Sequence, residues 1–357
     1  MTSRPEIPIR HGFYQMSETE HRDFVLHNIS PSIIDHDITI FLEYNLRLIS
    51  EEDSLDAGWP GAEAIKTLVQ SASGLFIWAA TACRFIREGL FADERLLALL
   101  KGGASAAATP EEHLNEIYIT VLHSSIQANF SQQEKERFCS MLREILGSVV
   151  TLLSPLSVYS LSRLLATSEQ RVVRSLKDLH AILDIPNNHR PLHLHHPSFR
   201  DFLLNEDRCR DSNFLVNEKL AHQTLAIRCI QLMSTSLKRD ICGVTLPGTC
   251  ATGIEQCRIE QCLPPEVSYA CLYWIQHLQN GGAQLHDNDD VHQFLQTHLL
   301  HWLEALSWMR KISEGILAVT SLESIALVSL LEYITRYATN ISFRVWTAPV
   351  YTRLFMI

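Results

Sequence analysis

The chain has 357 residues, of which 46% are hydrophobic and 20% charged, a composition that excludes a disordered protein and suffices for two or three packed units. Its formal net charge of −10 repels polyanions on average, so we expect no general binding to nucleic acids or anionic membranes. The nine cysteines, together with a start that lacks a basic-then-apolar leader pattern, favour reduced thiols and a cytoplasmic location.

The first hundred residues predict the remnant of one domain followed by a small helical domain. The segment TSRPE, residues 2–6, is typical of the end of a buried strand and its polar exit, so we expect residues 1–12 to be a remnant. Residues 13–108 predict the helical domain and its linker, with two short helical patterns around residues 30–32 and a Gly/Ala/Ser-rich connection over 101–109. A later apolar stripe recurs at helical spacing. It contains Leu75, Trp78, Ala82, Phe85 and Ile86.

Three capping boxes predict helix starts, at residues 109–112, 131–134 and 167–170. In each, a hydroxyl at the first position can accept a hydrogen bond from the third helical amide, while a Glu or Gln side chain reaches back. The first box also carries Pro110 at the favoured first helical position. We therefore take Thr109, Ser131 and Thr167 as N-caps.

Residues 109–205 predict a winged-helix domain, because a helix, a short helix, a third helix and a strand-like pair follow one another in the required order. The short helix opens after Pro155, and a turn at residues 186–191 precedes an alternating segment from Leu192 to His195. The apolar face predicted for the third helix comprises Val172, Leu176, Leu179 and Leu183.

The third helix also carries Arg171, Arg174 and Lys177, and winged helices often bind DNA. Glu169 and Asp178 dilute this charge, and a shared fold does not confer a function, so DNA binding is the alternative and not the main expectation. A basic third helix exposed on the surface would favour DNA binding, and an acidic or buried helix would exclude it.

A histidine cluster suggests a metal-dependent enzyme as a third class. His193 and His195 would point the same way on a strand and could bind Zn²⁺ if further ligands converged. No cysteine or carboxylate lies near them at ligand spacing, so we expect no metal site and a solvated or packed face instead.

Four cysteines fall between two helical regions, and their spacing favours free thiols over a zinc knuckle. A knuckle normally shows paired cysteines two to four residues apart, and only Cys257 and Cys262 approach this. The four are Cys242, Cys250, Cys257 and Cys262.

Residues 206–357 predict a helical connector domain. The most apolar window, residues 316–331, is interrupted by Glu323, so we expect no membrane span. In the tail over 343–357, Trp346, Val350 and Phe355 could cover an exposed face or aggregate. The large apolar anchors expected in the connector are Tyr269, Tyr273, Trp274, Trp302 and Trp308.

Several segments in chain order resemble fungal NACHT-type STAND NTPases, the class that includes heterokaryon-incompatibility proteins and is related to animal NOD-like receptors. They are TSRPE at 2–6, SASGLFIWAATA at 71–82, HPSFRDFL at 196–203 and YACLYW at 269–274, and the resemblance ends with HWLEALS and KISEG near residue 315. The resemblance implies an all-α fold with a small winged-helix β-hairpin, in which a helical domain, a winged helix and a helical connector follow in series.

A nucleotide-binding core would need a Gly-rich turn ending in Gly-Lys-Ser or Gly-Lys-Thr, and the sequence contains none, nor an acidic Walker-B strand. The resemblance therefore implies a truncated chain from downstream of the P-loop core, with no enzymatic activity of its own. We expect a regulatory or scaffold fragment that relays nucleotide state to oligomerisation or partner binding. ATP or GTP would be a cofactor only of a full-length relative, and the expected partners are proteins or further copies of this chain.

The resemblance also implies two nucleotide-binding residues, provided that a P-loop half is supplied. In the family, the HPSFRDFL segment supplies a histidine that meets the bound diphosphate, which places His196 in this role, and the TSRPE segment supplies Arg4 as a sensor. An imidazole can donate a hydrogen bond to a phosphate oxygen. Most phosphate affinity resides in the absent amide cradle and lysine, so we expect no catalytic residue and no bound cofactor in this chain.

Overall fold

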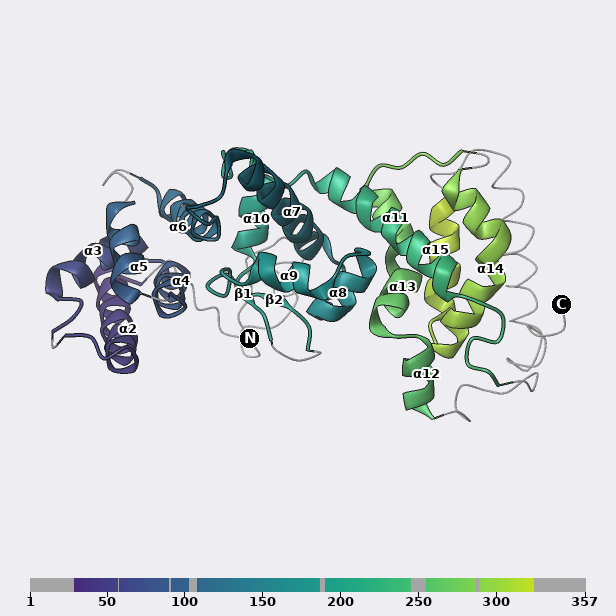
Figure 1. Ribbon diagram of the computed structural model, residues 1–357, viewed down its shortest axis with the longest axis horizontal. Helices are drawn as coiled ribbons and strands as arrows, with labels where there is room; N and C mark the ends of the chain where they lie inside the picture. The colour runs from purple at the N-terminus through teal and green to yellow at the C-terminus, as the bar shows by residue number, and fades with distance from the viewer. Residues whose placement is uncertain are drawn as a thin grey trace, which may run out of the picture.

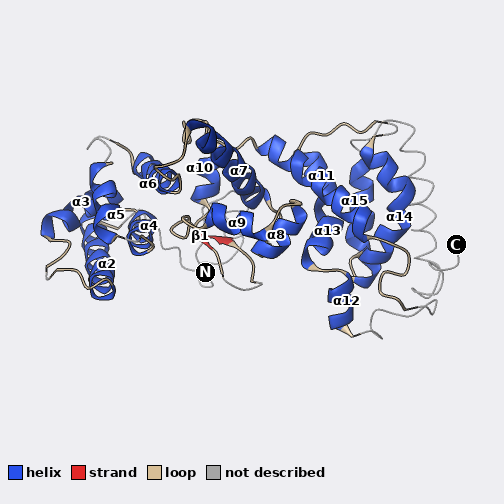
Figure 2. Ribbon diagram, in the orientation of Figure 1, coloured by secondary structure: helices blue, strands red, loops and turns tan. Residues whose placement is uncertain are grey.

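The computed structural model describes residues 29–56, 58–89, 91–102, 108–186, 190–244, 255–286 and 289–323. Over these ranges it contains fourteen α-helices and one two-stranded antiparallel sheet (Figure 2). The predicted fold class, all-α with a small β-hairpin, is confirmed. The helices form three groups along the long axis of the molecule, α2–α5 at one end, α6–α10 in the middle and α11–α15 at the other end (Figure 1).

The first group consists of α2 (Pro31–Glu52), α3 (Ala62–Ala72), α4 (Phe76–Arg87) and α5 (Ala92–Lys101). The sequence predicted two short helical patterns around residues 30–32. The prediction of a short second helix is wrong, because Pro31 begins one continuous helix of 22 residues. Proline is compatible with the first helical turn, where its missing N–H has no partner to lose. The first pattern, the remnant over 1–12 and most of the linker over 101–109 lie outside the described residues.

Two of the predicted capping boxes in the middle group are confirmed. Thr109 caps α6 (Pro110–Ser124) and Ser131 caps α7 (Gln132–Thr151), each hydroxyl accepting from the third helical amide while a glutamate reaches back. The third box is wrong by one residue. Ser168 and not Thr167 caps α9 (Glu169–Leu176), and its hydroxyl accepts from the amide of Arg171.

The rest of the middle group follows the predicted order of elements, with α8 (Val158–Leu164), β1 (Leu183–Asp184), β2 (His193–Leu194) and α10 (Ser198–Leu204). The apolar face predicted for the third helix is buried throughout, but α9 ends at Leu176 and Leu183 belongs to β1, paired with Leu194. Helix-like turns continue the apolar spacing past the helix end, since the amide of Leu179 donates to the carbonyl of Leu176 and that of Leu183 to Leu179.

The third group comprises α11 (Glu218–Ser236), α12 (Gln256–Cys262), α13 (Pro265–Asn280), α14 (Asp290–Trp308) and α15 (Ile312–Glu323). Helix α13 packs along α11 and carries Trp274, whose ring meets that of Trp302 on α14 edge to face at 5.6 Å between centroids. Both indoles are fully buried, and Trp302 donates to the carbonyl of Cys271 at 2.8 Å. The tail over 343–357 lies outside the described residues, and within them no helix combines the length and apolarity needed to cross a membrane.

Replacing Trp302 by alanine should destabilise the third group, because it removes a fully buried indole and its hydrogen bond. We expect the free energy of unfolding to fall by about 3–5 kcal/mol. The matched control is Leu300→Ala on the same helix, where the side chain is 48% exposed, and its effect should stay within about 0.5 kcal/mol. Chemical denaturation followed by circular dichroism measures both, and equal effects would contradict this packing.

Candidate functional site

The predicted nucleotide-contacting histidine, His196, lies between β2 and α10 and is held by side chains from two helices. Its Nδ1 accepts from the backbone amide of Ser198 at 3.2 Å and lies 2.6 Å from the Ser198 hydroxyl. That hydroxyl is in turn 2.7 Å from the phenol of Tyr118 on α6. A backbone N–H can only donate, so Nδ1 is the acceptor and the proton of the neutral imidazole resides on Nε2.

Tyr118 fixes one end of this hydrogen-bond chain because its ring is buried and packs against two aromatic side chains. It is 1% exposed and lies 5.1 Å from Phe199 and 5.5 Å from Phe202, measured between ring centroids. Burial raises the pKa of the phenol, so the hydroxyl keeps its proton. A chain of donation from Tyr118 to Ser198 and from Ser198 to His196 follows from these contacts.

A cationic side chain that the sequence analysis did not single out, Arg84 of α4, lies close to the same place. Its charge acts to lower the pKa values of both Tyr118 and His195. Its Nη1 is buried without a hydrogen-bond partner among the described residues. Burial lowers the pKa of Arg84, but a guanidinium remains charged. The sequence feature that could have revealed it is the presence of an arginine within the apolar stripe of residues 75–86.

The resulting His196 junction, which we define as Arg84, Tyr118, His195, His196 and Ser198, joins α4, α6 and α10. The indole of Trp78 on α4 donates to the carbonyl of His113 on α6 at 3.1 Å, which fixes the two helices together. A guanidinium can donate to an anionic acceptor such as a phosphate oxygen, but the unpartnered Nη1 is itself buried and closed to a ligand from solution. Arg4, the other predicted nucleotide-binding residue, lies outside the described residues.

The other predicted histidines do not converge. His195 Nε2 lies 3.0 Å from the carbonyl of His180, and burial, followed by the charge of Arg84, lowers its pKa. His193 instead lines a groove together with residues at the end of α7 and the start of α11. In the part of the chain that the structure describes, no three His, Cys, Asp or Glu side chains lie close enough to hold a metal ion.

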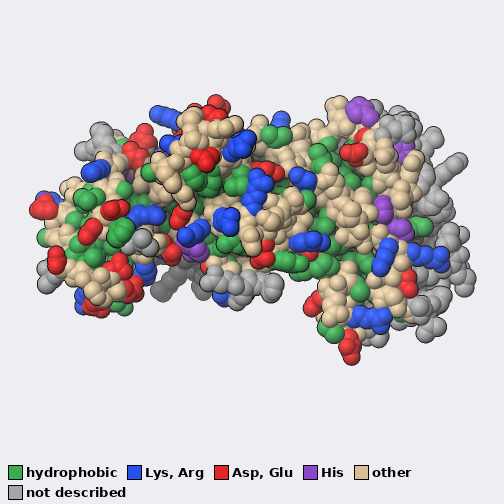
Figure 3. Space-filling view, viewed as in Figure 1, with side chains coloured by type: hydrophobic (Ala, Val, Ile, Leu, Met, Phe, Trp, Pro, Cys, Tyr) green, Lys and Arg blue, Asp and Glu red, His purple; other side chains and the backbone are tan. Residues whose placement is uncertain are grey.

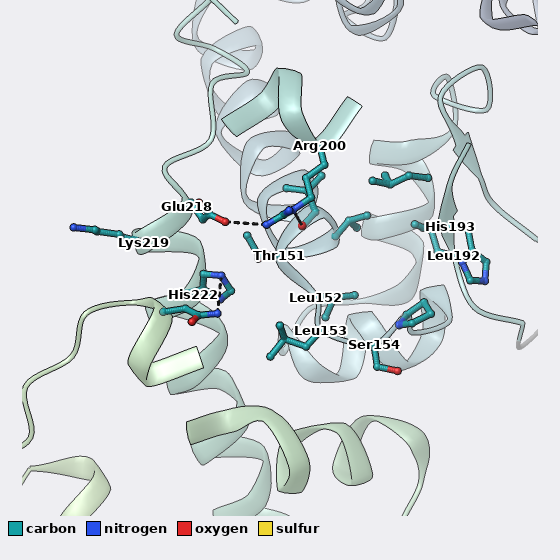
Figure 4. A pocket seen from close by; sticks show the side chains of 15 residues that line it. Thr151, Leu152, Leu153, Ser154, Leu192, His193, Arg200, Glu218, Lys219 and His222 are labelled. Atoms are coloured by element: carbon teal, nitrogen blue, oxygen red, sulfur yellow. Dashed lines mark hydrogen bonds and ion pairs between the residues drawn. The ribbon is translucent and has the colours of Figure 1, made fainter. Parts of the chain in front are cut away.

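The groove lined by His193 has a volume of about 760 Å³ and runs between the end of α7, β2 and the start of α11. Figure 4 shows Arg200 joined to Glu218 on the side opposite His193. The Arg200 Nη2 lies 2.9 Å from Glu218 Oε1, and its Nε donates to the carbonyl of Val150, also at 2.9 Å. The Arg200 guanidinium is therefore paired with a carboxylate within the groove.

Beneath the groove, a buried hydrogen-bond relay joins the middle and third groups. His222 of α11 meets His277 of α13 at 2.7 Å between their Nδ1 atoms, and His277 Nε2 lies 2.7 Å from the phenol of Tyr269. That phenol accepts from the amide of Leu153, which follows α7, at 3.1 Å. Burial, followed by the proximity of His222, lowers the pKa of His277 to about 3, so this imidazole is neutral near pH 7.

Comparison with known proteins gives one relative. The chain is 27% identical over 313 residues to the vegetative incompatibility protein HET-E-1 of Podospora anserina, a match that covers 81% of this chain and 22% of the relative. The chain thus spans about a fifth of the length of that protein. No family model and no solved structure matches it. The match supports a relationship at family level with fungal vegetative incompatibility proteins.

The buried His277 predicts a stability that falls with acidification. Its pKa is depressed in the folded state, so between pH 6.5 and about 3 the unfolded chain binds a proton that the folded chain does not. Stability that is complete above pH 6.5 is therefore lost as the pH falls, at a limiting slope of about 1.4 kcal/mol per pH unit for this residue.

Denaturant unfolding at successive pH values tests this expectation, with His277→Gln as the variant and His36→Gln, at an exposed position on α2, as the control. The first variant should flatten the acid slope and the second should leave it unchanged. Should His277→Gln fail to fold, a titration of the wild-type imidazole by NMR decides the question. Protonation of His277 near pH 6 in the folded chain would contradict its burial in the neutral form.

Proposed function

We propose that this chain is a non-catalytic regulatory and scaffold part of a NACHT-type STAND signalling protein, which relays nucleotide state into self-association. The observation that carries the proposal is His196, the first residue of the HPSFRDFL segment, whose Nε2–H tautomer is set by the Tyr118–Ser198 chain. The similarity to a vegetative incompatibility protein over 81% of the chain supports it independently.

The His196 junction fits one wall of a diphosphate site and no more. The proton on His196 Nε2 can be donated to a phosphate oxygen, and the half-buried Arg84, whose charge acts on Tyr118 and His195, adds positive charge to the junction. The sequence offers no Gly-Lys-Ser/Thr loop to wrap the phosphates, so these two side chains alone would bind nucleotide weakly. In this proposal His196 reports an occupied site and does not create it.

A contact at His196 would bias the packing between helix groups. His196 precedes α10 directly, and Arg200 on α10 is paired with Glu218 at the start of α11. The buried relay through Tyr269, His277 and His222 ties the end of α7 to α11 and α13. A shift of α10 would therefore be passed to the third group, and a two-state change in such an interface is a common form of switch.

The outer face of α2 supports self-association. Ile33, Ile40 and Tyr44 share one face of this helix at spacings of seven and four residues, and each is more than half exposed. Phe76 of the adjacent α4 is also exposed. Apolar side chains gathered on one face of a molecule mark a surface suited to a protein partner.

The proposal predicts that the purified chain does not hydrolyse ATP or GTP and that it self-associates as its concentration rises. Sedimentation velocity should show the association, and Ile40→Glu should weaken it, whereas Leu300→Glu, at a similarly exposed position on α14, should not. Nucleotide turnover above the blank that is lost in His196→Ala would contradict the absence of catalysis. A chain that stays monomeric at every concentration would contradict self-association through α2.

One observation favours a second candidate function, DNA binding through α9. Arg171, Arg174 and Lys177 are all exposed, the condition under which the sequence analysis favoured this alternative. Figure 3 shows Lys and Arg side chains gathered over the middle of the molecule, where α8 and α9 lie. Against it, the exposed Glu169 lies on the same helix, and the net charge is −10.

We expect the regulatory role and not DNA binding, so fluorescence anisotropy with duplex DNA should show at most weak, non-specific association. The double variant Arg174→Glu, Lys177→Glu is the informative one, with Lys135→Glu, Arg137→Glu on α7 as a charge-matched control. Tight binding with a steep salt dependence, lost in the first variant and kept in the second, would replace the regulatory proposal with the DNA-binding one.

A further inference from the structure

The outer face of α2 combines exposed apolar side chains with negative charge. Ile33, Ile40 and Tyr44 are each more than half exposed. The helix carries five Asp or Glu and a single Arg, Arg47, whose Nε lies 3.9 Å from a carboxylate oxygen of Glu51. Such a face is suited to a partner that presents apolar side chains together with positive charge.

The chain itself presents a surface of this kind on α8 and α9. Residues 158–177, which cover the two helices, the turn between them and the residue after α9, contain four Lys or Arg and a single Asp or Glu. The two helices pack against each other, and each has an apolar side chain in solvent. Tyr159 of α8 is 42% exposed and Val173 of α9 is 46% exposed. The surface is therefore opposite to α2 in charge and similar to it in apolar character.

Two cations of this surface lie beside Val173. Lys177, whose backbone angles remain helical, is four residues after Val173 and three after Arg174, so it neighbours both on the helix surface. Neither Arg174 nor Lys177 forms an ion pair with a described carboxylate. Arg171 is held differently, because its Nε lies 2.8 Å from Met141 Sδ on α7. Arg174 and Lys177 are thus the charges that α9 can offer to a partner.

The apolar side chains favour a protein partner over DNA at this surface. Phosphates would engage Arg174 and Lys177 but would gain nothing from Val173, whereas an acidic amphipathic helix can use all three. Figure 1 shows α2 at one end of the molecule and α8 and α9 in its middle, so the two surfaces are apart within one chain. The α2 face of one copy can therefore meet this surface only on another copy.

We propose that the α2 face of one copy docks on the α8–α9 surface of a second copy, an inference that rests on the proposed self-association and identifies the surface that α2 meets. Asp37 and Glu43 are exposed on α2, each three residues from Ile40, and supply the negative charge opposite Arg174 and Lys177. Because the contact joins two different surfaces, every copy in a dimer still has one of them free. Association then continues into a ring or a filament, whereas a contact between two α2 faces would stop at a dimer.

Charge reversal on each surface of the full chain tests the proposal by sedimentation velocity. Arg174→Glu, Lys177→Glu makes the α9 surface acidic, and Asp37→Lys, Glu43→Lys makes the α2 face basic. Each double variant alone should associate roughly tenfold or more weakly than the wild type, because like charges then meet. An equimolar mixture of the two should restore association, since each altered surface meets an opposite charge on the other variant.

The wild-type chain should form species larger than a dimer, and added salt should weaken them by screening the charges. Lys135→Glu, Arg137→Glu on α7 is the charge-matched control and should associate like the wild type. Circular dichroism checks that every variant is folded.

The outcomes separate this inference from the proposed function. Unchanged association of the α9 variant, while Ile40→Glu weakens association, would overturn the inference and leave self-association through α2 in place. A dimer as the largest species, or a mixture that associates no better than its components, would also overturn it. A chain that is monomeric at every concentration would contradict the proposed self-association itself. Tight binding of duplex DNA that is lost in the α9 variant would assign this surface to DNA instead.

Discussion

The hydrogen-bond chain from Tyr118 through Ser198 to His196 is the constraint on which the rest of this account depends. It starts at a phenol packed against two phenylalanines and ends at an imidazole whose Nδ1 is occupied by a backbone amide. Because the amide of Ser198 can only donate, the proton of the neutral His196 imidazole is on Nε2. In the proposed function this N–H donates to a phosphate oxygen, and the charge of Arg84, which acts on Tyr118 and His195, favours an anionic acceptor.

In the proposed function, the signal would pass through contacts between buried polar groups, because such groups have few alternative partners. The Tyr269–His277–His222 relay joins two residues of α13 to His222 of α11 and to the amide of Leu153, which follows α7. Breaking one contact would leave a buried group without a partner, which costs about 1–3 kcal/mol. An interface of this kind favours two discrete packings over a continuous deformation.

Much of the fold was predictable because its signals are local. The capping boxes at Thr109 and Ser131 determine helix starts with the residues of one turn, and the order of helices and strands that follows was predicted from periodicity, prolines and a turn segment. Errors occurred where local rules compete. Thr167 and Ser168 are both good N-caps. Leu183 continues the apolar spacing of α9, but the turns that carry this spacing lie beyond the end of the helix.

The candidate site was predictable only in part. The position of His196 followed from a motif, whereas its tautomer depends on Tyr118, which is distant in the sequence. Arg84 was missed because no spacing rule relates residues that only tertiary packing brings together. The predicted free thiols agree with the described cysteines, which are free in the structure.

The most direct test of the central claim is the tautomeric state of His196, measured from the ¹⁵N chemical shifts of its ring nitrogens at neutral pH. The account predicts an unprotonated Nδ1 and a protonated Nε2, with the assignment made by comparison with His196→Gln. A protonated Nδ1 would mean that the imidazole does not accept from Ser198, and the proposed phosphate-facing donor would then be absent.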